Sequence, residues 1–352
     1  MKVSVIGAGP SGCIVAASAL EENPAHSVIV YEEHKKLGFP EQCGGLLSKV
    51  AVDWFQEIGV DCRKIMLNRI KGIALHYKEK NIIIKDKETK AFVVQRAKFD
   101  QSCAEFAEKR GAKIKLGEKL TSKNIRELFS NSFIIGADGP FSRVAKTFNF
   151  PNIKNYAIAY QADITNLNLN FDERNNVQVF LYDKSFSWLI PINEERTHAG
   201  IIFFGNPDFR KFAYFLDDLK LRFDKKELKI KNFFSDCVPF SSRSQIQRRN
   251  VYLVGDAAGQ VKATSGGGVY YGCKSALLAG KTIETGDYEK RWKKEIGNDL
   301  EKHLVVRKIL NSINPDTTQL LLSVSSLLGI ESILKKYDME RIQSIFQFKS
   351  KT

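Results

Sequence analysis

Apolar residues recur along the chain with two different periods, and each period predicts a different kind of element. Short, continuously apolar runs at 2–6 and 27–31 are typical of strands that are buried on both faces of a parallel sheet. A run of small residues from about 11 to 21 lies between them and predicts a closely packed helix. These three elements form a βαβ unit of about 30 residues at the start of the chain.

The middle of the chain alternates apolar and polar positions, as strands with one solvated face do. Residues 69–94 predict three strands of an antiparallel sheet. A second strand-rich section spans 156–236 and is interrupted by a predicted helix over 209–222. Helical periodicity also occurs at 98–110 and from residue 287 to the end of the chain.

In sequence order these patterns interleave two regions, and they predict an α/β protein. A mostly antiparallel sheet that carries the substrate site is expected from 69–95 and 156–244, and C-terminal helices from 287–352. The remaining segments predict a Rossmann-like nucleotide-binding domain, which consists of residues 1–68, 96–155 and 245–286.

The first strand leads into Gly7-Ala8-Gly9-Pro10-Ser11-Gly12, whose glycine spacing is that of a dinucleotide-binding loop. Gly7 allows the tight turn, Gly9 lets the backbone approach a pyrophosphate, and Gly12 lets the helix pack against the strand. The helix N-terminus then presents free N–H groups to the phosphates. Glu32 ends the second strand and is suited to accept hydrogen bonds from both ribose hydroxyls. These features fit either FAD or NAD.

Two further motifs distinguish FAD from NAD. Residues 134–139 (IIGADG) form a strand-to-loop motif that precedes a helix. Residues 250–258 (NVYLVGDAA) predict another strand, which ends in Gly-Asp and is followed by three glycines at 266–268. At the end of a parallel strand, Asp256 is expected to face ribityl or ribose hydroxyls, and the N–H groups of the next helix are expected to face the flavin pyrimidine carbonyls.

In this order, the three glycine motifs resemble the FAD-binding domain of the para-hydroxybenzoate hydroxylase superfamily. Arg96 lies just before the helix at 98–110 and fits that superfamily's arginine that reaches the cofactor. The resemblance implies that the cofactor is FAD. The residues that it places at the cofactor are Gly7, Gly9, Ser11, Gly12, Glu32, Cys43, Gly44, Gly45, Arg96, Leu120, Asp138, Gly255, Asp256, Gly267, Gly268 and Val269.

Two stretches narrow the resemblance to the geranylgeranyl reductase family. Residues 38–45 (GFPEQCGG) look like that family's PxxCxG loop. Residues 186–191 (FSWLIP), followed by Gly200, are similar to its aromatic-x-Trp-x-aromatic-Pro…Gly-x-Gly motif. The chain departs from the family pattern at three positions, which are Ile190, Ile202 and Ala263.

The family resemblance implies a reaction, namely the reduction of isolated C=C bonds of isoprenoid chains by reduced FAD. An unactivated alkene needs a dry, apolar channel that holds it over the flavin ring. The resemblance places Trp188 in the wall of that tunnel and Cys43 beside the flavin, as the two candidate catalytic residues. Other residues are available as walls but fit the sheet core equally well: Phe186, Pro191, Phe203, Phe204, Phe240, Tyr270 and Tyr271.

Several points stay open at the level of sequence. Only one dinucleotide fingerprint is visible, so the electron donor is either ferredoxin or NADPH. The uncharged segment 317–330 is a candidate cover for the lipid tunnel. A flavin monooxygenase or halogenase is an alternative, although Phe186 breaks the halogenase motif WxWxIP. An electron-transfer flavoprotein at a membrane surface is another. The sequence does not indicate the oligomeric state.

Composition adds an expectation about partners. The chain of 352 residues has 54 Lys and Arg against 40 Asp and Glu, a net charge of +14. The basic residues are scattered and form no nucleic-acid module, so nucleic acid is not expected as a partner. The family resemblance implies an isoprenoid lipid instead. Peripheral contact with anionic headgroups fits the positive charge. The uncharged segment 317–330 is shorter than the roughly 20 residues of a membrane span, which favours a soluble protein.

The cysteine pattern indicates a compartment. Six cysteines show no CxxC spacing and no secretory leader precedes them, which favours the cytoplasm over disulfides or zinc. His198 is expected to be structural. The cysteines other than Cys43 are expected to fill the core, and they are Cys13, Cys62, Cys103, Cys237 and Cys273.

Overall fold

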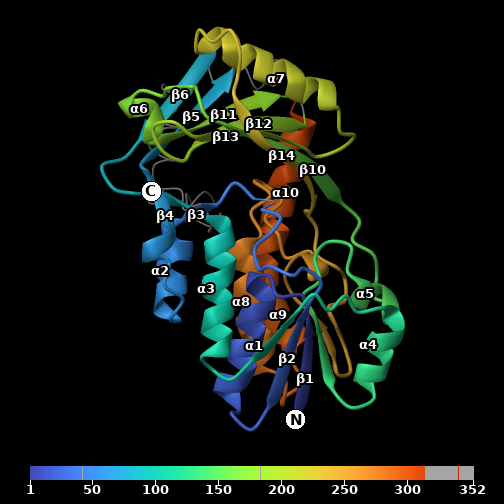
Figure 1. Cartoon of the computed structure of the whole chain (residues 1–352). Coiled ribbons are helices and arrows are strands. Elements are labelled where there is room, and N and C mark those ends of the chain that lie inside the picture. The colour runs from blue at the N-terminus through green and yellow to red at the C-terminus, as the bar shows by residue number, and fades with distance from the viewer. Residues whose placement is uncertain (42, 183, 314–339, 341–352) are drawn as a thin grey trace, which may run out of the picture.

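The computed structural model describes residues 1–41, 43–182, 184–313 and 340 (Figure 1). Its first sheet has six strands in the order β15-β16-β9-β1-β2-β8, and all neighbours except β15–β16 are parallel. These strands are β1 (Lys2–Ile6), β2 (Ser27–Glu32), β8 (Lys113–Leu116), β9 (Phe133–Gly136), β15 (Gln247–Arg248) and β16 (Val251–Leu253). The predicted βαβ unit is confirmed, with α1 (Pro10–Glu22) joining β1 to β2.

Helices pack against this sheet because their small residues allow close approach. α1 lies against α3 (Arg96–Glu108) and α8 (Val269–Lys281), and α4 (Ser122–Phe129) and α5 (Arg143–Thr147) lie beside β9 (Figure 1). The Ser18 hydroxyl of α1 donates to the Leu277 carbonyl of α8 at 2.7 Å. A Cβ on Gly280 would lie 2.5 Å from that of Ser18, so only glycine fits at this helix contact.

The second sheet has seven strands in the order β14-β10-β13-β12-β11-β5-β6. They are β5 (Gly72–Tyr77), β6 (Lys80–Lys85), β10 (Tyr156–Ile164), β11 (Asn176–Tyr182), β12 (Ser185–Pro191), β13 (Thr197–Phe203) and β14 (Ile230–Pro239). α7 (Phe209–Arg222) covers one face, where Phe212, Phe215 and Leu219 join the buried residues of the sheet. The short helix α6 (Phe171–Arg174) precedes β11.

A third, three-stranded sheet corrects the expectation that 69–94 form one antiparallel sheet. β7 (Ala91–Val94) pairs with both β4 (Met66–Ile70) and β3 (Leu46–Ser48), whereas β5 and β6 join the seven-stranded sheet. β5 also pairs with β11 in parallel. The chain changes sheets at Gly72, where a Cβ would lie 2.3 Å from both Asn176 Oδ1 and the Ile84 carbonyl oxygen.

The mixed α/β fold class is confirmed. The six-stranded sheet takes all its strands from 1–68, 96–155 and 245–286, and the seven-stranded sheet from 69–95 and 156–244. Domain boundaries at these positions stay a prediction, because the third sheet draws on both sets of segments. The remaining helices are α2 (Lys49–Glu57) after β3, and α9 (Tyr288–Trp292), a π-helical turn (Lys293–Gly297) and α10 (Asn298–Ser312) near the end. The candidate cover 317–330 lies outside the described residues.

The contact between α1 and α8 generates a stability prediction. We expect Gly280→Val to lower the free energy of unfolding by about 1–3 kcal/mol, because the larger side chain forces the two helices apart. Urea unfolding of the FAD-bound protein measures this loss. Gly205→Ala is the control, since a Cβ there meets no heavy atom within 4 Å. Equal stability of the two variants would contradict the close packing.

Candidate functional site

A cavity of ≈ 1290 Å³ is lined by the loops at the carboxyl ends of β1, β2, β9 and β16 and by the seven-stranded sheet. Its volume exceeds the roughly 300–1,000 Å³ of ordinary small-molecule pockets. Trp188 and every residue predicted at the cofactor, except Gly12, line this one cavity. Gly12 lies beneath the glycine turn, where a Cβ would come within 1.9 Å of the Gly7 carbonyl oxygen.

The glycine turn after β1 leaves room for a pyrophosphate. Gly7 has a left-handed φ of +102°, and its N–H donates to the Tyr31 carbonyl at 2.8 Å. A Cβ on Gly9 would meet no heavy atom within 4 Å, although Gly9 precedes α1 directly. The space in front of the α1 N-terminus is therefore open, and free helical N–H groups favour an anion there.

Glu32 is held in place at the end of β2 by its own hydrogen bonds. Its Oε2 accepts from the Ala8 N–H and its Oε1 from the His34 N–H, each at 2.9 Å. His34 Nδ1 lies 2.6 Å from the same Oε1. The carboxylate is thus oriented toward the cavity, where its remaining lone pairs suit ribose hydroxyls. Sequence analysis did not identify His34 as a partner of Glu32. The one feature in the sequence that indicates this contact is its position two residues after Glu32.

Asp138 lines the cavity but is engaged with the protein. Its Oδ1 accepts from the Ser142 hydroxyl at 2.6 Å, and its Oδ2 accepts from the N–H groups of Arg143 and Val144 at 2.7 and 3.0 Å. Asp138 thus satisfies free donors at the start of α5. Arg143 in turn donates to the Leu120 carbonyl, which fixes that residue at the cavity wall. Direct contact of Asp138 and Leu120 with the cofactor stays a prediction.

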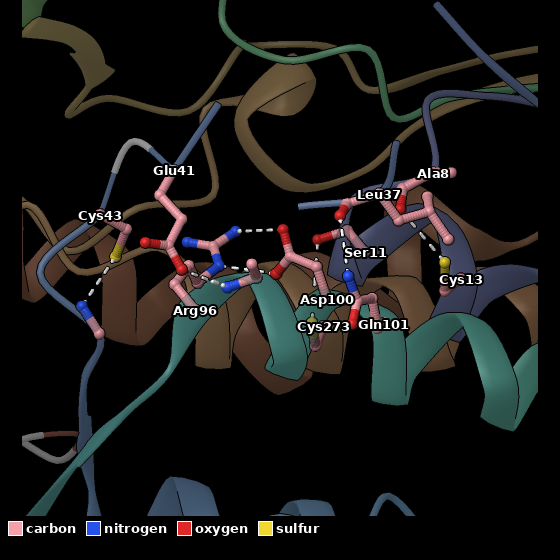
Figure 2. Close-up of polar contacts among 12 residues, drawn as sticks. Ala8, Ser11, Cys13, Leu37, Glu41, Cys43, Arg96, Asp100, Gln101 and Cys273 are labelled. Atoms are coloured by element: carbon pink, nitrogen blue, oxygen red, sulfur yellow. Dashed lines mark hydrogen bonds and ion pairs between the residues drawn. The ribbon is translucent and has the colours of Figure 1, made fainter. Parts of the chain in front are cut away.

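Figure 2 shows a polar cluster beneath the loop that contains Cys43. The Arg96 guanidinium pairs with the Asp100 carboxylate, with Nε to Oδ1 at 2.7 Å. The Gly45 N–H donates to Cys43 Sγ at 3.5 Å, and the Ala97 N–H donates to Glu41 Oε1 at 3.0 Å. Burial works against the charge of Arg96, but the charge of Asp100 and the contact with Cys43 raise the pKa of Arg96 above its usual value.

Sequence analysis did not identify Asp100 or Glu41 in this cluster. The signal for Asp100 was available, since it lies four residues after Arg96 on a helix and carries the opposite charge. Glu41 carried no comparable signal, because its partner is a main-chain N–H group of α3.

The loop after β16 supplies the opposite wall. Burial and the charge of Asp236 raise the pKa of Asp256 to about 6, although Arg96 opposes that shift. Gly266 has a φ of +74°, and a Cβ on Gly268 would lie 3.0 Å from Asp256 Oδ1. The glycines therefore let the loop fold tightly over Asp256, just before α8 begins at Val269.

Trp188 of β12 forms the wall on the seven-stranded sheet. Its Nε1 donates to Gln161 Oε1 at 3.2 Å. The indole lies over Gly200 of the neighbouring strand, where a Cβ would come within 2.2 Å of the ring. Apolar side chains around Trp188 complete this wall, and they include Val177, Val179, Phe186, Ile190, Ile202 and Val238.

The structure divides the candidate wall residues between the cavity wall and the core. Phe186 and Tyr270 line the cavity, but Pro191, Phe203, Phe204, Phe240 and Tyr271 do not. Phe203 faces α7, because side chains alternate along β13 and this one points away from the cavity. Phe204 and Phe240 pack against each other in a buried cluster, with ring centroids 5.2 Å apart.

The cysteine prediction is wrong at one position. Cys237 is half-buried and borders the cavity as part of the edge strand β14, although its side chain lies on the other face of the strand from Asp236 and Val238. The other four predicted core cysteines are buried: Cys13, Cys62, Cys103 and Cys273. Burial raises the pKa of Cys62 to about 12. His198 is not part of the cavity wall, and its Nδ1 lies 2.9 Å from Asp163 Oδ1.

Two negative findings apply to the described part of the chain. No group of three or more His, Cys, Asp or Glu side chains there is arranged to hold a metal ion. Within the same residues, no helix combines the length and apolar character that crossing a membrane requires.

Comparisons with known proteins identify the class. A family model described as an FAD binding domain matches residues 1–284, so the chain belongs to this FAD-binding family. The cofactor is FAD, and the protein is an FAD-dependent oxidoreductase. The geometry agrees with this cofactor, since the open space before α1, the oriented Glu32 and the loop at Asp256 border one cavity.

Individual relatives make the assignment more specific. The chain is 31% identical to an uncharacterized protein of Methanocaldococcus jannaschii, over 97% of this chain and 93% of that protein. It is 27% identical to digeranylgeranylglycerophospholipid reductase 1 of Methanosphaera stadtmanae, over 95% and 90% of the two chains. A geranylgeranyl bacteriochlorophyll reductase-like protein of Thermoplasma acidophilum has the same fold, with a TM-score of 0.78 at 20% identity over 98% and 94%. The resemblance to the geranylgeranyl reductase family is thereby confirmed.

The open space at Gly9 generates a binding prediction. Gly9 has an extended backbone, with φ −66° and ψ 175°, which any residue adopts. We expect Gly9→Leu to leave the thermal stability of the apoprotein unchanged and to weaken FAD binding at least about 10-fold, because the side chain fills the phosphate space. Flavin fluorescence titration measures the affinity. Unchanged affinity would show that the pyrophosphate lies elsewhere.

The raised pKa of Asp256 generates a prediction about pH. A carboxyl whose pKa is higher in the folded than in the unfolded protein costs stability once the pH exceeds both values. We expect the apoprotein to lose stability relative to Asp256→Asn as pH rises from about 4 to about 7. The loss is at most about 3 kcal/mol, the free-energy equivalent of a pKa that rises from 3.8 to about 6. Urea unfolding at both pH values measures it, and a relative gain would contradict the buried position.

Proposed function

We propose that this protein saturates C=C bonds of geranylgeranyl or other isoprenoid chains by hydride transfer from reduced FAD. The observation that carries the proposal is one cavity that joins the FAD-binding loops to an apolar wall on the seven-stranded sheet. An isoprenoid chain is long and apolar, and it matches a wall of aliphatic and aromatic side chains. Candidate substrates are archaeal-type membrane lipid precursors, a prenyl diphosphate or a prenyl quinone.

The chain's own residues position the reactants. When bound, FAD supplies the hydride, and the protein supplies binding and orientation. The N-terminus of α1 and the carboxylate of Glu32 hold the dinucleotide end. Trp188 is fixed by Gln161 and presents its indole as a flat, apolar surface for the isoprenoid chain. Exclusion of water by this wall keeps the reacting bond and the hydride donor in a dry space.

Cys43 is proposed to lie between the flavin and the substrate. Its sulfur accepts a hydrogen bond from Gly45 and contacts the buried cation Arg96, so the thiol is held at the cavity surface. We assign it a functional role beside the flavin ring. An alanine variant that retains both FAD binding and turnover would remove this role.

Two alternatives share the fold. The flavin-dependent brominase Bmp2 has a TM-score of 0.68 at 16% identity, over 99% of this chain and 98% of that one. This likeness concerns the fold alone, and Phe186 in this chain breaks the halogenase motif. An electron-transfer flavoprotein at a membrane surface is the other alternative. The reductase is favoured because the wall opposite the flavin loops is mostly aliphatic.

Electron supply and membrane contact belong to the same proposal. Ferredoxin or NADPH is proposed to reduce the flavin, and the positive net charge of +14 is proposed to draw the protein to anionic headgroups. Binding to anionic but not to neutral vesicles, lost at high salt, supports the second statement.

A direct assay tests the reductase. The dithionite-reduced protein is mixed with geranylgeranyl lipids of several head groups, and mass spectrometry follows the lipid. We expect a gain of two mass units for each bond reduced, together with reoxidation of the flavin. Trp188→Ala is expected to slow turnover at least about 10-fold, because the isoprenoid chain loses its flat support. Tyr214→Ala is the control, since Tyr214 lies 69% exposed on α7, on the opposite side of the sheet.

The same protein preparation distinguishes the reductase from the two alternative functions. Rapid NAD(P)H-dependent release of hydrogen peroxide, stimulated by an aromatic compound, would favour the monooxygenase or halogenase. Stable FAD binding with neither activity would favour electron transfer. No mass gain with any prenyl head group rejects the reductase.

A further inference from the structure

The edge strand β14 presents an aspartate to the cavity on the wall that carries Trp188. Asp236 pairs with Ala159 of β10, and two residues further on Val238 packs in one apolar cluster with Ala159, Phe186 and Trp188. Side chains alternate along a strand, so Asp236 and Val238 share a face. Asp236 is therefore an acid on the substrate side of the cavity.

The other face of β14 supports this orientation. Phe233, at an odd position of the same strand, stacks with Tyr160 on the side covered by α7, with ring centroids 6.2 Å apart. The even positions of β14 thus face away from α7. Asp236 is held there by a hydrogen bond in which the Cys237 N–H donates to Oδ1 at 2.7 Å.

The loop between β16 and α8 lies directly across from Asp236 and Val238. A Cβ on Gly266 would lie 3.0 Å from Ile202 Cδ1 and 3.6 Å from Val238 Cγ1. Ile202 pairs with Ala159, which in turn pairs with Asp236. Asp236 thus lies in the narrow region where the cofactor loop and the apolar wall approach each other.

The Asp236 carboxyl interacts with titratable groups from three elements. Arg96 on α3 acts on Asp236, and the charge of Asp236 in turn acts on Asp256 in the loop after β16 and on the Cys237 thiol of β14. Burial raises the pKa of Asp236, the hydrogen bond from Cys237 opposes this, and Arg96 opposes it further. The net effect raises the pKa of Asp236 above its ordinary value, because burial outweighs the two opposing contacts.

Most other carboxyls that line the cavity have protein partners of their own. Asp100 pairs with Arg96, Asp86 pairs with Lys90 at 2.7 Å, and Glu340 pairs with Lys262 at 2.8 Å. Glu41 accepts from a main-chain N–H of α3, and Asp138 accepts at the start of α5.

Asp256 is the other carboxyl to compare with Asp236 as a proton donor. It lies on the cofactor side, since its Oδ1 is covered by the glycine loop at Gly268. An ordinary thiol, with a pKa of about 8.5, is a weaker acid than a carboxylic acid. Asp236 is thus the carboxyl that combines a raised pKa with a place on the apolar wall.

We propose that the Asp236 carboxyl is the proton donor in the reduction of the isoprenoid C=C bond. The assignment rests on the proposed function. The alkene π bond breaks as one carbon receives the hydride from reduced FAD and its neighbour receives the proton from Asp236. The products are the saturated bond, oxidised flavin and the Asp236 carboxylate, which takes a proton from water before the next turnover.

The first test observes the acid itself, without turnover. Protein that contains FAD and ¹³C-carboxyl aspartate is titrated by NMR, and the Asp236 signal is identified by its loss in Asp236→Asn. We expect the pKa of this carboxyl to lie above that of an ordinary aspartate. A titration in the ordinary range overturns the assignment, whatever the activity.

The second test measures a single turnover. The dithionite-reduced protein is mixed anaerobically with a geranylgeranyl lipid that the wild type reduces, and flavin reoxidation is followed. We expect Asp236→Asn to slow this step at least about 100-fold, with unchanged FAD affinity, and Asp236→Glu to restore part of the rate. Asp217→Asn, on exposed α7, is the matched control and retains the wild-type rate.

The pH profile separates a proton donor from a residue that only shapes the wall. The wild-type rate is expected to fall as pH rises through the pKa of Asp236, and this fall is absent in Asp236→Asn. A variant with the wild-type rate and profile overturns the assignment while the proposed function stands. A wild type that reduces no prenyl lipid overturns the proposed function, and the assignment fails with it.

Discussion

The half-buried cation Arg96 acts on acidic side chains from several walls of the cavity. It pairs with Asp100 on its own helix, contacts the Cys43 loop, and acts on Asp256 and Asp236 from the remaining two walls. Without this charge, the buried carboxylates would repel one another at the place where FAD and substrate must meet. Arg96 therefore holds together the cofactor loops and the substrate wall, which come from distant parts of the sequence.

The two walls of the cavity are built by different means. The cofactor side consists largely of main chain, because glycines at Gly7, Gly9 and Gly266 permit turns and close approach that side chains would block. The substrate side consists of side chains on a rigid sheet, with Trp188 and its aliphatic neighbours. A shared fold with a brominase follows from this division, since the cofactor side can stay constant while the substrate wall changes.

Sequence alone located more of the cofactor side than of the substrate side. Strand, glycine turn and Glu32 are local in sequence, so β1, α1 and β2 and the cavity position of Gly7 and Glu32 could be predicted. The division of residues 69–94 between two sheets depends on Gly72, whose neighbours come from β6 and β11. Cys237 was placed in the core because its strand gives no local sign of lying at an edge. Asp236 was missed because only pairing with β10 shows which face it occupies.

The packing of Trp188 over Gly200 limits which side chains can occupy these two positions of the wall. The indole occupies the volume that a side chain on the adjacent strand would fill, so the two positions share one space. A bulkier residue at the glycine is compatible only with a smaller residue at the tryptophan, and substitutions there are coupled rather than additive. The width of the channel is therefore a joint property of two neighbouring strands.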